Sequence, residues 1–167
     1  MNLPEKFRAV VITLSDRASR GEYPDLSGPA IKEHLAVFFS SINASCDIES
    51  VLIPDDSRKL SEEFLKAAGS SDLVITTGGT GIGPHDITVE TIGPLLTKEI
   101  PGIMEFIRVK YGSEKPNALL SRGIAGLSGR CLVYTLPGSV KAVNEYMTEI
   151  IKTLEHTFFM LYGIDRH

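Results

Sequence analysis

Short apolar runs alternate with segments of helical periodicity along the first half of the chain. Runs of this kind, rich in Val, Ile and Leu, are typical of strands buried in a parallel sheet, and they predict strands at residues 7–14, 48–53 and 73–75. The segments between them carry apolar residues at helical spacing, which predicts one helix that begins near Pro29 and a second that Ser57 caps. Strands that alternate with helices favour parallel pairing, with helices on both faces of the sheet.

The pattern changes in the second half of the chain. Thr88 is expected to cap a short helix, a longer helix follows, and two strands then come close together at residues 118–127 and 131–136. The short connection between these strands predicts a hairpin instead of another parallel crossover. An amphipathic helix over residues 140–158 comes last. The fold class is therefore predicted to be α/β, a three-layer α/β/α sandwich with a mostly parallel mixed sheet, in one domain that spans residues 1–167.

A glycine-rich loop follows the third predicted strand and ends in a carboxylate. Four glycines stand within six residues, at Gly78, Gly79, Gly81 and Gly83. Glycine reaches positive φ at little cost and has no Cβ, so a loop of this composition can turn its backbone N–H groups toward an anion. Asp86 suits such a site mainly if a cation such as Mg²⁺ lies between the carboxylate and a phosphate. The loop predicts a site for a metal-bound nucleotide or phosphate ester, although a tight turn that binds nothing has the same composition.

Two common glycine-loop motifs do not match this segment. A P-loop has Lys followed by Ser or Thr after its last glycine, whereas Pro84 follows Gly83 and the loop contains no lysine. A dinucleotide-binding loop that used Gly79 and Gly81 would need a third glycine at the position of Pro84. The common NTPases and the common dehydrogenases are therefore both disfavoured.

Polar segments follow the other predicted strands as well. Residues 15–27 come after the first strand, Asp55 after the second, and Pro137 and Gly138 after the last. In a parallel α/β sheet, ligands bind beyond the carboxyl ends of the strands, where these segments would meet the glycine loop. Asp55 by itself, next to Pro54, has the composition of an ordinary turn. Several polar segments at one edge favour a site more than any single segment does.

Composition and charge exclude several classes of function. The chain of 167 residues has a net charge of −4, with 17 Lys and Arg against 21 Asp and Glu, and it has no run of basic residues that would coat a nucleic acid. Its two cysteines, Cys46 and Cys131, are expected to be buried and reduced. His34, His156 and His167 are expected to be structural or solvated. No apolar run approaches the ~20 residues that span a bilayer, and the first residues lack a signal peptide pattern, so a soluble cytoplasmic protein is expected.

Six ordered segments resemble those of one known family. The chain is similar, over nearly its whole length, to the MogA/MoaB family of molybdenum cofactor biosynthesis proteins, which includes the N-terminal domain of gephyrin. The matching segments are Ser15-Asp16-Arg17-Ala18-Ser19, Asp25-Leu26-Ser27-Gly28, Leu52-Ile53-Pro54-Asp55, Thr77-Gly78-Gly79-Thr80-Gly81 with Asp86 and Thr88, Ser121-Arg122, and Leu136-Pro137-Gly138-Ser139.

The resemblance implies a reaction and a set of site residues. Family members of the MogA type transfer AMP from MgATP to the terminal phosphate of molybdopterin and release pyrophosphate, before the metal is inserted. Asp55 and Asp86 are then the implied catalytic carboxylates, which hold Mg²⁺ directly or through water, while ATP and molybdopterin are the substrates. The residues implied to bind substrate or nucleotide are Ser15, Asp16, Arg17, Thr77, Gly78, Gly79, Thr80, Gly81, Ser121, Arg122, Pro137, Gly138 and Ser139. The resemblance also implies a homotrimer that hands its product to a molybdenum insertase, with no nucleic acid or membrane partner.

Several of these residues also have structural interpretations. Asp16 and Arg17 have the composition of a solvated charge pair in a loop. Ser121 and Arg122 could offer a hydroxyl and a fork to a phosphate, or could be ordinary residues at the edge of a strand. Ser139 could shape the floor of the pocket or simply cap the last helix.

Two positions depart from the family pattern. Relatives often carry an arginine immediately before the loop aspartate, where this chain has His85, and an imidazole is a weaker phosphate partner than a guanidinium. Relatives also often carry Pro-Glu after the loop threonine, where this chain has Val89 and Glu90.

Two other functions stay open beside the enzyme: a MoaB-like module that binds molybdopterin without catalysis, and an unrelated nucleotide-binding regulator. The presence of Pro54 and Asp55 favours the enzyme.

Overall fold

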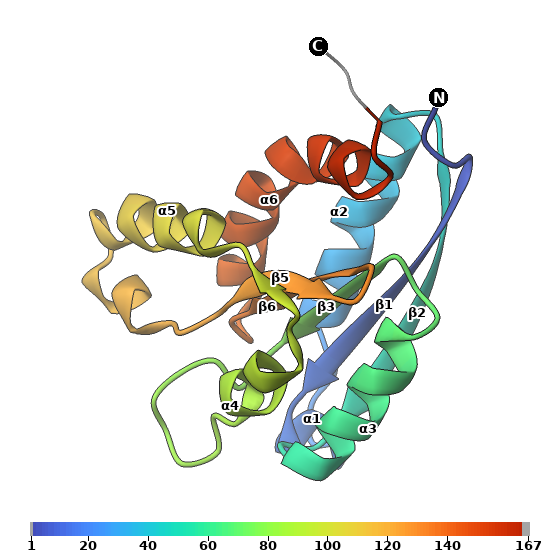
Figure 1. Ribbon diagram of the computed structural model, residues 1–167. Helices are drawn as coiled ribbons and strands as arrows, with labels where there is room; N and C mark the ends of the chain where they lie inside the picture. Colours follow the sequence, from blue (N-terminus) through green and yellow to red (C-terminus); the bar gives the residue numbers. More distant parts are fainter. Residues whose placement is uncertain (1, 165–167) are drawn as a thin grey trace.

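The computed structural model describes residues 2–164 and shows a six-stranded sheet with helices on both faces (Figure 1). The strands are β1 (Lys6–Leu14), β2 (Ser45–Ile53), β3 (Leu73–Thr77), β4 (Lys98–Glu99), β5 (Ala125–Ser128) and β6 (Cys131–Leu136). The helices are α1 (Asp16–Ser19), α2 (Ser27–Ser41), α3 (Ser57–Ala68), α4 (Thr88–Ile92), α5 (Pro101–Gly112) and α6 (Val140–Leu161), with 3₁₀ turns η1 (Gly93–Leu95) and η2 (Pro116–Leu120). The three strands predicted in the first half of the chain are confirmed, and so is the hairpin of β5 and β6.

The strand order β2-β1-β3-β6-β5-β4 explains where a site can form. β1 pairs in parallel with β2 and β3, and β3 pairs in parallel with β6. β5 pairs antiparallel with both β4 and β6. The predicted mostly parallel mixed sheet is thus confirmed. The register aligns Leu14 with Ile53, and it aligns Thr77 with both Thr13 and Leu136. The four parallel strands therefore end nearly level, so the loops that follow them meet at one edge of the sheet.

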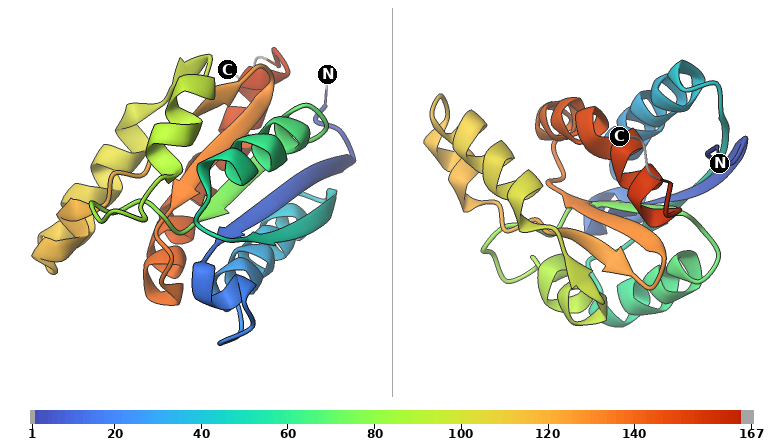
Figure 2. Two further views of the ribbon diagram at one scale, coloured as in Figure 1. Left: turned by 90° about the horizontal axis from the view of Figure 1, so that it is seen from below. Right: turned by 45° about the horizontal axis from the view of Figure 1, so that its top comes forward.

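Two hydrophobic cores cover the two faces of the sheet. Successive side chains of β1 point to alternate faces, as the period of a strand requires. Those that pack with α2, α5 and α6 are Phe7, Ala9 and Val11, and those that pack with α3 and α4 are Val10, Ile12 and Leu14. The right view of Figure 2 shows α2 and α6 on one side of the sheet and α3 and α4 on the other. The predicted three-layer α/β/α sandwich is thus confirmed.

An aromatic cluster anchors the larger core. The Phe7 ring lies 5.0 Å from the Phe39 ring and 4.8 Å from the Phe158 ring, measured between centroids. All three side chains are buried, and burial of each contributes roughly 2–3 kcal/mol of hydrophobic stabilisation. The cluster joins β1 to the two helices that cover this face, α2 and α6.

Residues 118–127 do not form the single strand that the sequence predicts. The run begins inside η2, which Pro116 starts, and only its last residues pair in the sheet as part of β5. Leu119 packs directly on the end of α5, where a Cβ on Gly112 would lie 2.6 Å from the leucine side chain. The hydrophobicity of this run therefore reflects packing of η2 on α5, and not a long strand.

Two helix starts differ from the predicted ones. Asp56, and not Ser57, caps α3, because its carboxylate accepts a hydrogen bond from the Lys59 amide at 2.7 Å. Thr88 is the first residue of α4 and does not cap it. Its hydroxyl instead donates to the Gly78 carbonyl at 2.8 Å, so the side chain fastens the glycine loop to the helix.

Residues 15–27 are not entirely a loop. They contain α1, a single turn that Ser15 caps by accepting a hydrogen bond from the Ala18 amide at 3.1 Å. α2 begins at Ser27, slightly before Pro29. Ordinary capping chemistry thus gives order to a segment whose composition predicts only a loop.

The cysteines and the other histidines have structural surroundings. Cys131 is buried and Cys46 is partly buried; neither forms a disulfide, and burial raises the pKa of both thiols to about 12. His34 forms a hydrogen bond with a side chain of α6, and His156 is exposed on the same helix. His167 lies outside the described residues.

Between residues 2 and 164, no helix has the length and apolar character needed to cross a membrane.

Candidate active site

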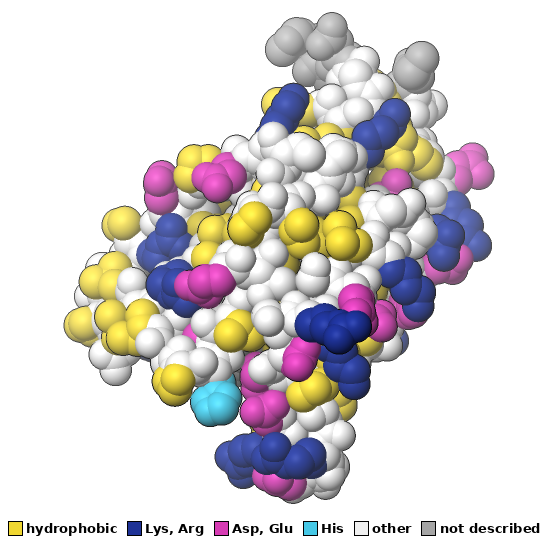
Figure 3. All heavy atoms as spheres, turned by 60° about the horizontal axis from the view of Figure 1, so that its bottom comes forward, with side chains coloured by type: hydrophobic (Ala, Val, Ile, Leu, Met, Phe, Trp, Pro, Cys, Tyr) yellow, Lys and Arg dark blue, Asp and Glu magenta, His cyan; other side chains and the backbone are white. Residues whose placement is uncertain are grey.

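A cavity of about 740 Å³ opens at the edge of the sheet where the parallel strands end. Its walls come from the loops after β1, β2, β3 and β6 and from η2. Figure 3 shows this end of the molecule, where acidic and basic side chains both gather on the surface. The predicted site residues that line the cavity are Ser15, Asp55, Gly78, Gly79, Thr80, Gly81, Asp86, Ser121, Pro137 and Gly138. The fold therefore brings most of the predicted site residues to one cavity.

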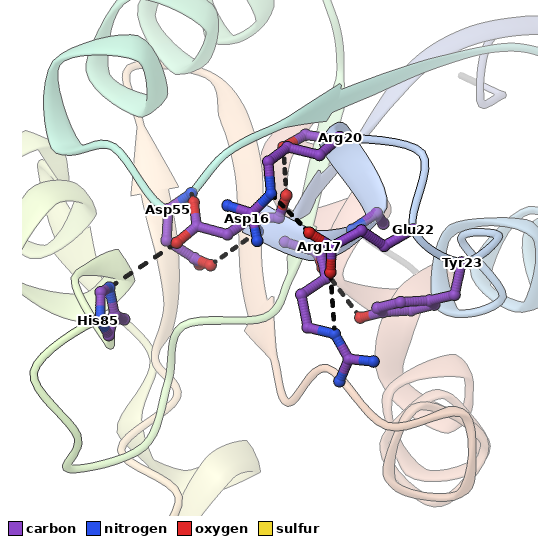
Figure 4. A network of polar contacts seen from close by, with 10 residues as sticks. Asp16, Arg17, Arg20, Glu22, Tyr23, Asp55 and His85 are labelled. Carbon is purple, nitrogen blue, oxygen red and sulfur yellow. Dashed lines mark hydrogen bonds and ion pairs between the residues drawn. The ribbon is translucent and has the colours of Figure 1, made fainter.

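Asp16 and Asp55 connect the loop after β1 to the loop after β2. The Asp16 amide donates a hydrogen bond to Asp55 Oδ2 at 3.0 Å, and the Asp55 amide donates to Asp16 Oδ1 at 2.9 Å (Figure 4). His85 Nδ1 lies 3.8 Å from Asp16 Oδ2. Asp55 lines the cavity, whereas Asp16 is not among its lining residues.

The surroundings of Asp55 favour its neutral form. Partial burial raises its pKa most, and the neighbouring charges of Asp16 and Asp86 raise it further. The hydrogen bond from the Asp16 amide and the nearby His85 act in the opposite direction. A cation in the cavity would counter the repulsion among these carboxylates and favour ionised Asp55.

Two glycines make the turn at the start of the glycine loop. Gly78 and Gly79 have φ angles of 100° and 68°, in the region that favours glycine. A Cβ on Gly78 would lie 2.3 Å from the Leu14 carbonyl oxygen, and a Cβ on Gly79 would lie 2.4 Å from the Thr88 hydroxyl. The loop passes so close to β1 and α4 that neither position has room for a side chain.

The other two glycines surround the Asp86 carboxylate. The Gly83 amide donates a hydrogen bond to Asp86 Oδ2 at 2.7 Å. A Cβ on Gly81 would lie 2.7 Å from the same oxygen. Asp86 is partly exposed and lines the cavity. The loop therefore fixes the orientation of the carboxylate that the sequence predicts to be catalytic.

Arg122 and Thr77 support the loops from outside the cavity lining. Arg122 Nε donates to the Gly81 carbonyl at 2.7 Å, and both terminal nitrogens donate to the Glu90 carboxylate. This pairing raises the pKa of Arg122 and lowers the pKa of Glu90. The Thr77 hydroxyl donates to the Pro137 carbonyl at 2.8 Å. The guanidinium that the sequence offers to a phosphate is thus already held by a carboxylate.

Arg17 and Ser139 also lie away from the cavity lining. Arg17 Nε is 3.4 Å from the Glu22 carboxylate, its guanidinium lies 4.9 Å from the centre of the Tyr23 ring, and its side chain is 69% exposed (Figure 4). The Ser139 hydroxyl accepts a hydrogen bond from the Ala142 amide and caps α6. Arg17 is therefore part of a solvated charge pair and Ser139 is a helix cap, as their structural interpretations predict.

Asp25 lines the cavity but is absent from the predicted site residues. Its Oδ2 accepts a hydrogen bond from the Thr13 hydroxyl at 2.7 Å, and its Oδ1 accepts from the Ser27 hydroxyl and the Gly28 amide, both at 3.1 Å. An aspartate that precedes a helix start by two residues is a recognisable local capping signal. Further lining residues outside the prediction include Tyr23, Asn117 and Leu120, of which Leu120 lies in the run whose hydrophobicity predicts a strand.

The described lining of the cavity carries three carboxylates, Asp25, Asp55 and Asp86, and neither Lys nor Arg. Within residues 2–164, no three His, Cys, Asp or Glu side chains gather in a way that could hold a metal ion. Mg²⁺ commonly binds one or two carboxylates together with substrate phosphates and water. Asp55 and Asp86 therefore fit an Mg²⁺ ion that shares its coordination with a phosphate, and not a metal enclosed by protein alone.

Comparisons with known proteins place the chain in a family. The family model described as a probable molybdopterin binding domain matches residues 10–156. The chain belongs to this family. A family relative from Pyrococcus furiosus, named molybdopterin adenylyltransferase, is 39% identical over 156 residues, which cover 90% of this chain and 88% of the relative. The crystal structure of the molybdopterin biosynthesis enzyme MoaB from Thermus thermophilus matches with a TM-score of 0.84 and 35% identity, over 94% of this chain and 97% of that chain.

Other members of the molybdopterin binding domain family are much longer. The molybdenum cofactor synthesis protein cinnamon from Drosophila melanogaster is 33% identical over 153 residues, which are 90% of this chain but only 25% of that protein. The chain thus spans about a quarter of that relative. The predicted membership of the MogA/MoaB family is confirmed, while the names of the relatives include both adenylyltransferase and MoaB.

Proposed function

We propose that the chain is a molybdopterin adenylyltransferase, which transfers AMP from MgATP to the terminal phosphate of molybdopterin and releases pyrophosphate. The observation that carries the proposal is that Asp55 and Asp86, from loops after different strands, line one cavity beside the glycine loop. The name of the Pyrococcus furiosus relative supports the same reaction. The place of the reaction is molybdenum cofactor biosynthesis in the cytoplasm, with ATP and molybdopterin as substrates.

The chemistry of this transfer makes few demands on acid–base groups. An oxygen of the terminal phosphate forms a bond to the α-phosphorus of ATP, and the bond from that phosphorus to the bridging oxygen breaks, so that pyrophosphate leaves with the electron pair. The second pKa of a phosphate monoester is about 6, so the attacking group is already largely anionic near neutral pH. The main obstacles are the repulsion between two polyanions and their mutual positioning.

The residues of the cavity meet these obstacles in two ways. Asp55 and Asp86 would hold Mg²⁺, and the bound ion would neutralise charge on the phosphates. The hydroxyls of Thr80 and Ser121, which lie 3.5 Å apart, can donate hydrogen bonds to phosphate oxygens, as can backbone amides of the glycine loop. His85 lines the same cavity and offers an imidazole where relatives have a guanidinium.

A reaction assay tests the proposal. Purified chain is mixed with molybdopterin, ATP and Mg²⁺, and adenylylated molybdopterin and pyrophosphate are measured. Asp55→Asn and Asp86→Asn should each lower the rate by more than about a hundredfold, since each removes a ligand of the ion. Asp47→Asn, at an exposed position of β2 far from the cavity lining, is the matched control and should keep the wild-type rate.

The competing function predicts a different outcome of the same assay. A MoaB-like binding module would bind molybdopterin tightly but form neither adenylylated product nor pyrophosphate. That result would contradict the enzyme proposal. Wild-type turnover in both aspartate variants would contradict the assignment of Asp55 and Asp86 as catalytic residues.

We also propose that the chain forms a homotrimer and hands its product to a molybdenum insertase, as the family resemblance implies. The exposed apolar surface of α5 and η2 supports assembly, because monomeric proteins rarely expose a large contiguous apolar patch. Its members are Phe106, Val109, Leu119 and Leu120, with exposed fractions of 55, 68, 54 and 52%. Sedimentation equilibrium of the wild-type chain should give the mass of three copies, and the mass of one copy would contradict the trimer.

A further inference from the structure

Arg122 connects the upstream limb of the glycine loop to the helix that follows the loop. Its amide donates to the Thr80 carbonyl at 2.8 Å, and its Nε donates to the Gly81 carbonyl at 2.7 Å. Its terminal nitrogens donate to both carboxylate oxygens of Glu90 on α4, Nη2 to Oε2 at 3.2 Å. Arg122, which is distant in sequence, thus contacts both the glycine loop and the helix that follows it.

The middle of the loop has few other attachments. At its start, the Gly78 amide donates to the Leu136 carbonyl at 2.9 Å. Further along, the hydrogen bonds between residues 80–86 and the rest of the described chain come from Ser121 and Arg122. Of these, the contact with Ser121 is a long one at 3.5 Å. His85 Nδ1 also lies 3.8 Å from Asp16 Oδ2, so the two short hydrogen bonds to this stretch, at 2.7 and 2.8 Å, are those of Arg122.

The guanidinium of Arg122 is not placed to contact a ligand. Arg122 is absent from the lining of the cavity, and all three of its guanidinium nitrogens have protein partners. Glu90 receives the two terminal nitrogens side by side, a geometry that fixes the plane of the fork. Because the Glu90 side chain is 57% exposed, the ion pair itself adds little to the stability of the fold. The effect of the ion pair is to orient the guanidinium of Arg122.

We propose that Arg122 is a positioning residue: oriented by Glu90, its fork holds the Gly81 carbonyl and so keeps the loop amides and Asp86 in the arrangement that receives the phosphates of the substrate. The connection to Asp86 is direct, because the carboxylate of Asp86 lies against Gly81 and accepts a hydrogen bond from the Gly83 amide. The identity of the phosphate ligand rests on the proposed function. The role of Arg122 in holding the loop does not depend on the proposed function.

Hydrogen exchange of the loop amides, measured without any substrate, tests the mechanical role. In Arg122→Met, which keeps a long side chain but has no N–H donor, the Gly83 amide should exchange about tenfold faster than in the wild-type chain, because the loop loses its side-chain attachment at Gly81. Arg58→Met is the control, since it breaks an ion pair with Glu62 on α3 that is more exposed than the pair of Arg122 and Glu90, and it should leave the exchange unchanged. Unchanged exchange in Arg122→Met would overturn the proposal.

A charge-reversed double variant separates the ion pair from the hydrogen bond to the loop. Glu90→Arg combined with Arg122→Glu restores opposite charges, but a glutamate at position 122 has no donor for the Gly81 carbonyl. Fast exchange of the loop amides should therefore persist in the double variant. Recovery of wild-type exchange would overturn the proposal, because it would show that charge alone holds the loop.

The affinity for MgATP distinguishes positioning from direct contact with phosphate. Under our proposal, Glu90→Ala and Arg122→Met both weaken MgATP binding by about tenfold in isothermal titration calorimetry, while Arg122→Lys, which keeps a donor, recovers part of the affinity. If Arg122 bound phosphate directly, Glu90→Ala would free its guanidinium and leave the affinity unchanged or higher, which would overturn the proposal. A chain that lacks adenylyltransferase activity would still give the exchange results, so failure of the proposed function is recognised separately.

Discussion

Asp16 and Asp55 exchange hydrogen bonds, each backbone amide donating to the carboxylate of the other, at 3.0 and 2.9 Å. The consequence is a division of roles between two aspartates that the sequence places in the same site. Asp55 lines the cavity, whereas Asp16 is absent from the lining and contacts Asp55 through the two hydrogen bonds. Because the Asp16 amide holds one oxygen of the Asp55 carboxylate, Asp55 loses little conformational freedom when it binds a ligand.

Removal of the Asp16 side chain should therefore damage the function of Asp55. We expect Asp16→Ala to lower kcat by about ten- to a hundredfold, in the range of other supporting residues around metal sites. Asp16→Asn keeps an oxygen that can accept from the Asp55 amide, so its kcat should stay close to that of the wild-type chain. The two variants are compared by steady-state kinetics at saturating MgATP. Equal losses in both would show that the charge of Asp16, and not its hydrogen bond, is required.

Gly78 should tolerate no side chain. A Cβ there would meet the Leu14 carbonyl oxygen at 2.3 Å, and its φ of 100° strains any other residue. We expect Gly78→Ala to lower the free energy of unfolding by more than about 2 kcal/mol. In Gly102→Ala, the matched control on α5, the new Cβ meets no atom within 4 Å, and the change should raise the same free energy by up to about 1 kcal/mol. Urea titrations followed by circular dichroism measure both, and equal stabilities would contradict the clash.

Glu149 should make the stability of the chain depend on acid pH. Its side chain is buried in α6 and accepts hydrogen bonds from Lys110 at 2.6 Å, Lys152 at 2.7 Å and Tyr111 at 3.1 Å. The lysine bonds in particular lower its pKa from 4.5 to about 2. Because the pKa is lower in the folded chain than in the unfolded chain, the stabilisation is present above about pH 4.5 and is lost as the pH falls toward 2.

The variant Glu149→Gln isolates this contribution. We expect it to lower the free energy of unfolding by about 1–2 kcal/mol at pH 7, and to approach the wild-type value near pH 2, where the glutamate is protonated. Denaturant titrations across this pH range measure the difference. A difference that stays constant with pH would mean that packing around residue 149, and not its charge, is responsible.

Removal of divalent metal should affect binding and not folding. The described chain contains no enclosed metal site, so EDTA should shift the melting temperature by less than about 1 °C in the absence of nucleotide. The same treatment should abolish measurable ATP binding, because the cavity lining offers three carboxylates against one histidine and neither Lys nor Arg. Differential scanning calorimetry and isothermal titration calorimetry provide the two measurements. Loss of folded structure in EDTA would instead indicate a structural metal.

The sequence predicts the strands and the carboxyl edge well because those features depend on local signals. Buried β-branched runs identify β1 and β3, and the glycine cluster identifies the loop that wraps Asp86. The role of Arg122 depends on Glu90, a partner far away in sequence, and the role of Leu119 depends on how η2 folds back onto the end of α5. From the sequence alone, Arg122 could be a phosphate ligand, but in the structure Glu90 holds its guanidinium. Leu119 belongs to a hydrophobic run that predicts a strand, but in the structure it packs against Gly112. Pairwise packing of this kind leaves no periodic trace in a single sequence.

The charge of the cavity wall has a consequence for turnover. Among the described lining residues, three carboxylates stand against one histidine, His85, and neither Lys nor Arg. A free polyanion such as metal-free ATP would therefore be repelled from the cavity. Under the proposed function, the magnesium ion then acts as the counterion of the nucleotide and enters together with it. The same argument applies to departure: pyrophosphate would leave as its magnesium complex, and each catalytic cycle would begin with the cavity free of metal.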